Sequence, residues 1–164
     1  MEISAGVAAD LAEIVEIYNE TAENSIANLD TEPTSVAERH AWLAQFSGTG
    51  PHRLVVARRG DQIAGYASSQ PYRAHPAFAE TVEVSVALRP DSRGQGVGTA
   101  LYRELFGCLA DEPVHVALAG IALPNDASVA LHRKFGFTEV GTFREYAVKN
   151  GQYISSVWMQ RRWP

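Results

Sequence analysis

Apolar positions in the first third of the chain recur with a helical period at two places. The first set lies at i, i+3, i+4 and i+7: Leu11, Ile14, Val15 and Tyr18. Asp10, with Glu13 three residues later, predicts a capping box at the start of this helix. Ser35 and Glu38 repeat that signature, and the helix behind them is expected to bury three apolar side chains: Trp42, Leu43 and Phe46. Residues 24–33 between the helices have no period, so we expect a loop that can cover a substrate.

Short apolar runs of strand length make up much of the remaining chain. They are residues 2–7, 54–58, 63–69, 82–88, 114–121, 137–149 and 152–160. Arg59-Gly60-Asp61 predicts a turn between the second and third runs. Asn150-Gly151 predicts a type I′ hairpin between the last two, because both central positions of that turn need positive φ.

Two further helices are expected in the second half. One follows a glycine-rich turn and runs to about Ala110, with Val97, Leu101 and Leu105 on one face. The other begins at Pro124-Asn125-Asp126 and ends with Gly136 in the C′ position. Its apolar side chains are Val129, Leu131 and Phe135. The sum is one α/β domain over residues 1–164, a mixed sheet of about seven strands with about four helices.

Charge and cysteine content narrow the class of protein. The chain has a net charge of −5 with only 14 Lys and Arg, scattered along it, which disfavours a nucleic-acid surface. No apolar run approaches the roughly 20 residues that span a bilayer. The single cysteine, Cys108, cannot form an internal disulfide, and no charged and apolar leader is visible. We therefore expect a cytoplasmic protein with no membrane or nucleic-acid partner.

The glycine-rich turn is the first candidate for chemistry. Arg93-Gly94-Gln95-Gly96-Val97-Gly98 follows an apolar strand and opens a helix, which places free backbone N–H groups at a helix N-terminus and favours an anion. The P-loop ending of Gly-Lys-Ser/Thr is absent, and the dinucleotide fingerprint needs glycine or alanine where Thr99 stands. A loop that uses glycine only for positive φ is the structural alternative.

The run R-x-x-G-x-G behind a strand ending in Arg89-Pro90 resembles the acetyl-CoA pyrophosphate loop of the GNAT superfamily of N-acetyltransferases. That resemblance implies a GNAT fold with central strands splayed around the acyl-CoA site. It also implies acetyl-CoA as co-substrate and a set of cofactor-binding residues, several acting through their backbone: Val86, Ala87, Leu88, Arg93, Gly94, Gln95, Gly96, Val97, Gly98, Thr99 and Asn125. Asn125 also suits a simple N-cap, and the two roles can coexist.

Glu83 is an acid near the start of an apolar strand. Period 2 places it on one face with Ser85 and Ala87, opposite the face of Val82 and Val84. A solvated edge-strand residue or a salt-bridge partner is the structural alternative. Thr81-Val82-Glu83 and other segments along the chain resemble the phosphinothricin and methionine sulfoximine N-acetyltransferases. In that group the equivalent glutamate is taken as the general base.

His132 lies on the last expected helix, in Leu131-His132-Arg133-Lys134-Phe135-Gly136-Phe137. The resemblance places it where many GNAT enzymes carry a tyrosine that protonates the CoA thiolate, and where the phosphinothricin group has histidine. A side chain with an ordinary pKa near 6.5 can donate to a thiolate whose acid has a pKa near 8.5. An inert surface histidine is the alternative.

Arg73 and His75 lie in the aperiodic loop 71–80 before Glu83. The resemblance implies that this loop binds the carboxylate and oxoanion of a small amino acid analogue, and that Asn28 and Leu29 contribute from loop 24–33. His75 departs from the arginine of phosphinothricin enzymes, and Leu29 from their aromatic residue. Another amine substrate, such as a peptide N-terminus, a polyamine or an aminoglycoside, stays open, as does a non-catalytic acyl-CoA-binding domain.

Two remaining expectations concern a metal and a partner. The histidines and acids show no metal-ligand spacing, so no metal is expected. Cys108 is expected on a buried apolar helix face with no adjacent base, which disfavours an acyl-cysteine mechanism. We also expect a homodimer.

Overall fold

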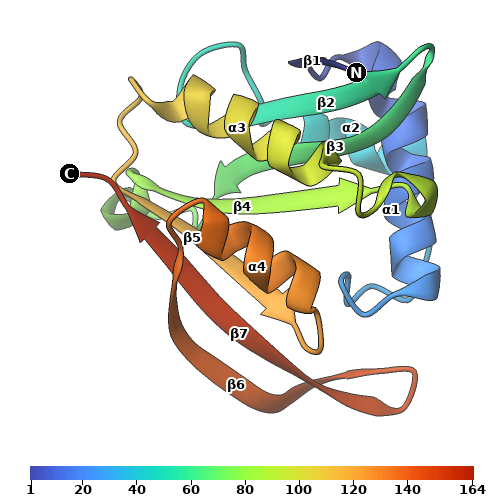
Figure 1. The fold of residues 1–164 in the computed structure, drawn as a ribbon, viewed down its shortest axis with the longest axis vertical. Helices are drawn as coiled ribbons and strands as arrows, with labels where there is room; N and C mark the ends of the chain where they lie inside the picture. The colour runs from blue at the N-terminus through green and yellow to red at the C-terminus, as the bar shows by residue number, and fades with distance from the viewer.

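A seven-stranded mixed sheet forms the centre of the computed structural model, which describes residues 1–164 (Figure 1). The strands are β1 (Glu2–Ala5), β2 (Arg53–Arg59), β3 (Gln62–Pro71), β4 (Thr81–Leu88), β5 (Val116–Ala122), β6 (Thr138–Lys149) and β7 (Gln152–Arg162). The helices are α1 (Leu11–Asn24), α2 (Val36–Leu43), α3 (Val97–Leu109) and α4 (Asp126–Lys134). The predicted α/β class and the numbers of strands and helices are confirmed. None of the helices has the length and apolar character needed to cross a membrane.

The sheet has the order β1-β2-β3-β4-β5-β7-β6, and β4 and β5 form its one parallel pair. This pair is short: only Thr81, Val82 and Glu83 of β4 have partners on β5, with Glu83 opposite Leu118. Beyond that point β4 stays paired with β3 as far as Leu88, while β5 follows β7 to Ala122. The two central strands therefore separate directly after Glu83, and the predicted splay is confirmed.

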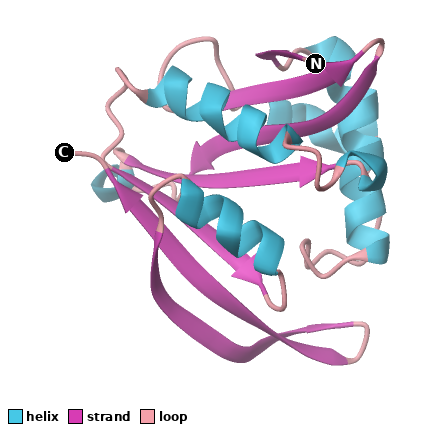
Figure 2. Cartoon of the chain, in the orientation of Figure 1, coloured by secondary structure: helices cyan, strands magenta, loops and turns pink.

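Helices cover both faces of the sheet (Figure 2). Buried side chains of α3 pack with inward-facing residues of the central strands, including Val82 and Val84, in a core of 19 residues. A smaller cluster joins Ile14 and Ile17 of α1 to β2 and β3 on the other face. Because Val82 and Val84 face α3, the odd-numbered residues of β4 face the opposite side. The predicted orientation of Glu83 is thus confirmed.

Two predictions from short sequence motifs are confirmed, because the interactions that they require lie within the motif itself. Ser35 accepts the N–H of Glu38 at 3.2 Å and the Glu38 carboxylate accepts the N–H of Ser35 at 2.7 Å, so the second capping box is present. Asn150 and Gly151 both have positive φ, as the type I′ turn requires.

The prediction of a capping box at Asp10 is wrong. A short 3₁₀ turn, Ala8–Asp10, precedes α1, and Asp10 makes no side-chain cap on that helix. Its carboxylate instead accepts the N–H of Val7 at 2.9 Å and pairs with Arg58. Glu13 accepts the N–H of Ile63 at 2.8 Å and pairs with Arg89. Partners on β2, β3 and the end of β4 have overridden the local motif.

Two expected elements are shorter than their patterns indicated. The first strand ends at Ala5, and the second helix ends at Leu43, before Phe46. Trp42, Leu43 and Phe46 are half-buried, because α2 lies at the margin of the smaller apolar cluster.

Candidate active site

A cavity of about 660 Å³ lies where β4 and β5 separate. Eleven of the thirteen residues assigned from the sequence to the cofactor or to catalysis line it: Val86, Ala87, Leu88, Arg93, Gly94, Gly96, Val97, Gly98, Thr99, Asn125 and His132. The two others are Gln95 and Glu83. Several further lining residues were not identified from the sequence: Thr21 of α1, the following residues Ser25, Ile26 and Ala27, residues 119–122 of β5, and Lys134 of α4.

The glycine loop and the start of α3 form one end of the cavity. Gly96 is the N-cap of α3 with φ 80°, a conformation that glycine tolerates best. The first backbone hydrogen bond of α3 runs from the N–H of Ala100 to the carbonyl of Gly96, at 3.0 Å. The N–H groups before Ala100 are therefore free of intrahelical partners. A Cβ at Gly94 or Gly96 would meet no atom within 4 Å, so the loop leaves open space beside its backbone. These features suit a phosphate-bearing ligand.

Two cationic side chains lie at this end of the cavity. Arg93 lines the wall and pairs with Glu20 at 3.2 Å. Lys134 lines the opposite side, where its ammonium is 3.5 Å from the Thr99 hydroxyl. No acidic residue occupies the first turn of α3. The local charge therefore favours an anion, although the whole chain is acidic.

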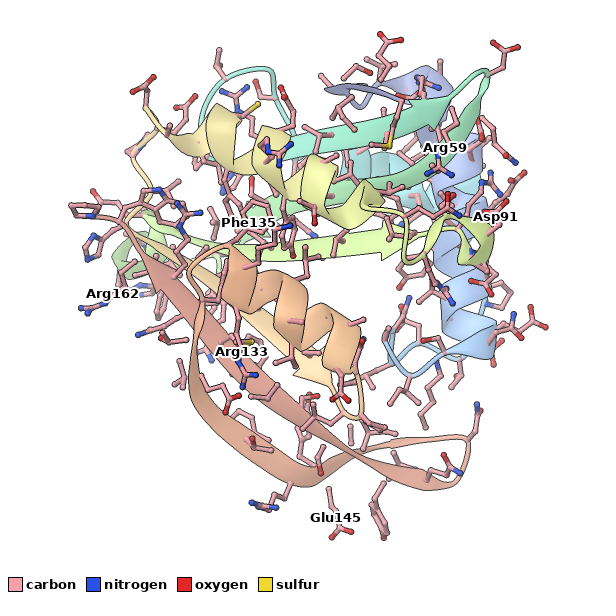
Figure 3. All side chains as sticks on the ribbon, in the orientation of Figure 1. Arg59, Asp91, Arg133, Phe135, Glu145 and Arg162 are labelled. Atoms are coloured by element: carbon pink, nitrogen blue, oxygen red, sulfur yellow. The ribbon has the colours of Figure 1, made fainter.

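Gln95 belongs to the loop without lining the cavity. Its side-chain oxygen accepts from Arg59 at 2.6 Å, and its amide nitrogen donates to the carbonyl of Asp91. Figure 3 shows Arg59 and Asp91 beside the glycine loop, at the N-terminal end of α3. Gln95 thus fixes the loop through its side chain, and only its backbone is free to serve a ligand.

The wall beneath the loop is backbone as much as side chain. Beyond Glu83, the edge of β4 that faces β5 has no strand partner, and it carries Val86, Ala87 and Leu88. Backbone N–H and C=O groups at such an edge can pair with the amides of an extended ligand, like an added strand.

Glu83 lies at the other end of this edge, in the last β4–β5 pair. β4 is a central strand, so the edge-strand alternative is wrong, and Glu83 forms no ion pair. Burial raises the pKa of this half-buried carboxyl. A carboxylate with a raised pKa and no compensating cation is typical of functional sites.

A row of polar side chains borders Glu83 on the same face. Gln70 is directly opposite Glu83 on β3, and its amide donates to Ser68 at 3.1 Å. Ser68 is 3.1 Å from the hydroxyl of Ser85, and Trp42 of α2 donates to Gln70 at 3.2 Å. Sequence periodicity alone did not identify this row, because its members come from three elements.

His132 lines the cavity but is 3% exposed. Its Nδ1 is 2.7 Å from the carbonyl of Ser128, which can only accept, so Nδ1 carries a proton. Nε2 is 2.8 Å from the hydroxyl of Tyr102, which then donates to it. Burial lowers the pKa of His132, which favours this neutral form. The alternative of an exposed surface histidine is wrong, and Tyr102 is a partner that the sequence did not indicate.

Asn125 is the N-cap of α4, where its side-chain oxygen accepts the N–H of Ser128 at 3.1 Å. It also lines the cavity. The capping role read from the sequence is therefore confirmed.

The four residues assigned to substrate binding lie outside the cavity. Arg73 is over the rings of Tyr72 and Phe78, at 5.1 and 5.7 Å from their centroids. His75 accepts the N–H of Ala77 at 3.1 Å, and Asn28 accepts the N–H of Asp30 at 2.8 Å. Leu29 is exposed.

Comparison with known proteins agrees with this geometry. A family model described as an acetyltransferase (GNAT) domain matches residues 3–158. The chain belongs to the GNAT acetyltransferase family, as its motifs indicated, and is an acetyltransferase.

Three relatives are similar over almost their whole length. A phosphinothricin N-acetyltransferase of Streptomyces coelicolor is 44% identical over 163 residues, covering 98% of this chain and 95% of the relative. An L-methionine sulfoximine/L-methionine sulfone acetyltransferase of Pseudomonas paraeruginosa is 36% identical, covering 95% and 90%. The crystal structure of a phosphinothricin acetyltransferase from Sinorhizobium meliloti in complex with AcCoA has a TM-score of 0.91 and 34% identity, covering 98% and 87%.

Proposed function

We propose that this acetyltransferase uses acetyl-CoA to acetylate the α-amine of a small amino acid analogue of the phosphinothricin, methionine sulfoximine or methionine sulfone type. One observation carries the proposal: Glu83, half-buried and without an ion-pair partner, lies where β4 and β5 separate, beside a cavity bounded at its far end by the glycine loop. The names of the relatives at 44% and 36% identity support this substrate class.

The cavity fits acetyl-CoA, which supplies the acetyl group as a thioester when bound. The backbone at residues 94–99 would hold the pyrophosphate, since the N-terminus of α3 is free and open there. The unpaired edge of β4 at residues 86–88 would hold the amides of the pantetheine arm, with Asn125 on the opposite wall. Arg93 and Lys134 would add positive charge near the phosphates.

Glu83 would serve as the general base. An amine is nucleophilic only without its extra proton, and a carboxylate whose pKa is raised toward neutrality accepts that proton more readily than an ordinary one. The polar row of Gln70, Ser68 and Ser85 lies beside Glu83 and would orient the amine or a bridging water.

His132 would return a proton to the CoA thiolate, with a condition set by its contacts. Nδ1 is engaged by Ser128, so the ring must take up a proton at Nε2 and open its bond to Tyr102 before it can donate. Its lowered pKa makes that charged form rare at neutral pH. We therefore expect Glu83 to contribute more to the rate enhancement than His132 does.

Substrate selection would fall to two loops, one directly before β4 and one between α1 and α2. Arg73 would bind a carboxylate or oxoanion through its guanidinium fork, with His75 as its neighbour, and Asn28 and Leu29 would approach from the α1–α2 loop. Arg73 has no carboxylate partner in the chain, which supports this role.

We further infer a cytoplasmic homodimer. β6 is an edge strand of the sheet, and the β6–β7 hairpin exposes five large apolar side chains: Val140, Phe143, Tyr146, Val148 and Tyr153. Exposed apolar groups gathered on one hairpin are typical of a protein contact. Sedimentation equilibrium at micromolar protein should give twice the chain mass, and a monomer would contradict this assembly.

A thiol-release assay tests the proposed substrate class. Acetyl-CoA is held constant while phosphinothricin, methionine sulfoximine, methionine sulfone, spermidine, an aminoglycoside and a short peptide are offered separately. The amino acid analogues should give the highest kcat/KM. A preference for spermidine, the aminoglycoside or the peptide would move the enzyme to another amine. Release equal to an amine-free control for every compound would indicate a domain that only binds acyl-CoA.

A further inference from the structure

Lys149 is the last residue of β6, next to the hairpin turn, and only 3% of it is exposed. Its ammonium donates to three backbone carbonyls on a distant segment: Ala22 at 2.6 Å, Ser25 at 2.6 Å, and Asn28. An ammonium has three donors, so all three are used. No carboxylate forms an ion pair with it.

The carbonyl of Ala22 is available to Lys149 for a structural reason. α1 ends at Asn24, so its last carbonyls, including that of Ala22, have no following turn to bond. The helix also has no basic residue in its last turn to balance its dipole. Lys149 supplies that positive charge from a position 127 residues away along the chain.

The same segment forms a wall of the active-site cavity. Thr21, Ser25, Ile26 and Ala27 line it, whereas Lys149 does not. The rest of the loop is fixed to α1 by Tyr18, which donates to Asp30, and by Asn19, whose side chain makes two bonds of 2.9 Å to the backbone of Thr34. Of these attachments, Lys149 thus lies nearest in the sequence to the residues that line the cavity.

We propose that Lys149 is a positioning residue, which ties the β6–β7 hairpin to residues 22–28 and so holds the cavity wall of Ser25, Ile26 and Ala27 in place for acetyl-CoA. The proposal rests on the proposed function in that the cavity receives acetyl-CoA. It does not depend on which amine is acetylated.

Lys149→Met tests this, since methionine keeps most of the length and loses the charge and all donors. Hydrogen exchange followed by mass spectrometry should show residues 22–30 exchanging at least about tenfold faster, with the buried strands β3 and β4 unchanged. The KM for acetyl-CoA should rise about tenfold, because a wall that is no longer held in place must be ordered when the ligand binds, while kcat at saturation changes less. Lys149→Arg, which keeps a cation and donors, should recover part of the loss.

Arg144→Met is the matched control, because Arg144 is exposed on the same strand and makes none of these contacts. It should leave both measurements at wild-type values. If Lys149→Met does not fold, Lys149→Gln is measured in its place and should show the same local pattern at smaller size.

Unchanged exchange at residues 22–30, a uniform rise over the whole sheet, or a local rise with an unchanged KM for acetyl-CoA would each overturn the proposal. The exchange measurement needs no turnover. A wild type inactive toward every amine would therefore contradict the proposed function while Lys149 is still judged by its effect on residues 22–30.

Discussion

Glu83→Gln is the substitution that bears most directly on the chemistry. Glutamine keeps the size and shape of the side chain on β4 but cannot accept a proton. A positioned general base contributes about 10²- to 10⁴-fold, so kcat should fall by that factor, or about 2.7 to 5.5 kcal/mol of activation free energy. The KM for acetyl-CoA should change less than about twofold, since Glu83 does not line the cavity.

The pH dependence should change as well. Burial raises the pKa of Glu83, so the base becomes competent only above the ~4.3 of an ordinary glutamate. In the wild type, kcat/KM should therefore rise with pH through that raised pKa. The variant should lack this limb, and its residual rate should rise only as the amine loses its own proton at high pH.

The stability of the folded wild type should fall as pH rises, whereas its activity should increase. Because burial disfavours the charged carboxylate, the folded chain binds this proton more tightly than the unfolded chain does. The wild type thus loses stability as pH rises from ~4.3 through the raised pKa. Glu83→Gln should melt at the same temperature as the wild type near pH 4, and at the same or a higher temperature at pH 7.

Steady-state kinetics from pH 5 to 10 and thermal melts at both pH values measure these effects. Glu80→Gln is the matched control: it makes the same chemical change on an exposed side chain one residue before β4. Wild-type kcat in Glu83→Gln at neutral pH would refute the assignment of Glu83 as base. An equal loss in both variants would refute it too.

Three further substitutions test other parts of the site. Gly96→Val should raise the KM for acetyl-CoA about tenfold or more, because Gly96 has φ 80° and a side chain there would occupy the open space beside the loop. An unchanged KM would show that the loop is not part of the cofactor site. Arg73→Ala should lower kcat/KM for methionine sulfone about ten- to a hundredfold, with Arg73→Lys between it and the wild type and the KM for acetyl-CoA nearly constant; equal activity of all three would show that the loop binds no anion. Tyr102→Phe leaves buried Nε2 of His132 without its donor and should cost about 1 to 3 kcal/mol in a urea melt, and an unchanged midpoint would show that this bond is not formed in solution.

The sequence predicted best those features whose cause is local. The glycine loop, the face on which Glu83 lies and the Ser35 capping box each depend on residues within a short stretch. The splay of β4 and β5 came from the resemblance alone, because nothing in either strand's own pattern indicates where pairing stops.

Features that depend on distant partners could not be read from the pattern. Asp10 was expected to cap a helix and instead pairs with Arg58, 48 residues away. His132 looked like an available acid, and only the fold brings Tyr102 against its free nitrogen. Lys149 gave no signal at all, since its three acceptors are backbone carbonyls more than 120 residues away. Arg73 and His75 lie outside the cavity, and the aperiodic pattern of loop 71–80 gave no indication of where the fold would place them.

The most direct test of the central claim is the identity of the acetylated compound. The enzyme is incubated with acetyl-CoA and an equimolar mixture of methionine sulfone, phosphinothricin and spermidine. The products are then identified from their fragments by tandem mass spectrometry. We predict one acetyl group on the α-nitrogen of the amino acid analogues, with little acetylated spermidine, and loss of these products in Glu83→Gln. Acetylation mainly of spermidine, or consumption of acetyl-CoA without any acetylated amine, would contradict the account.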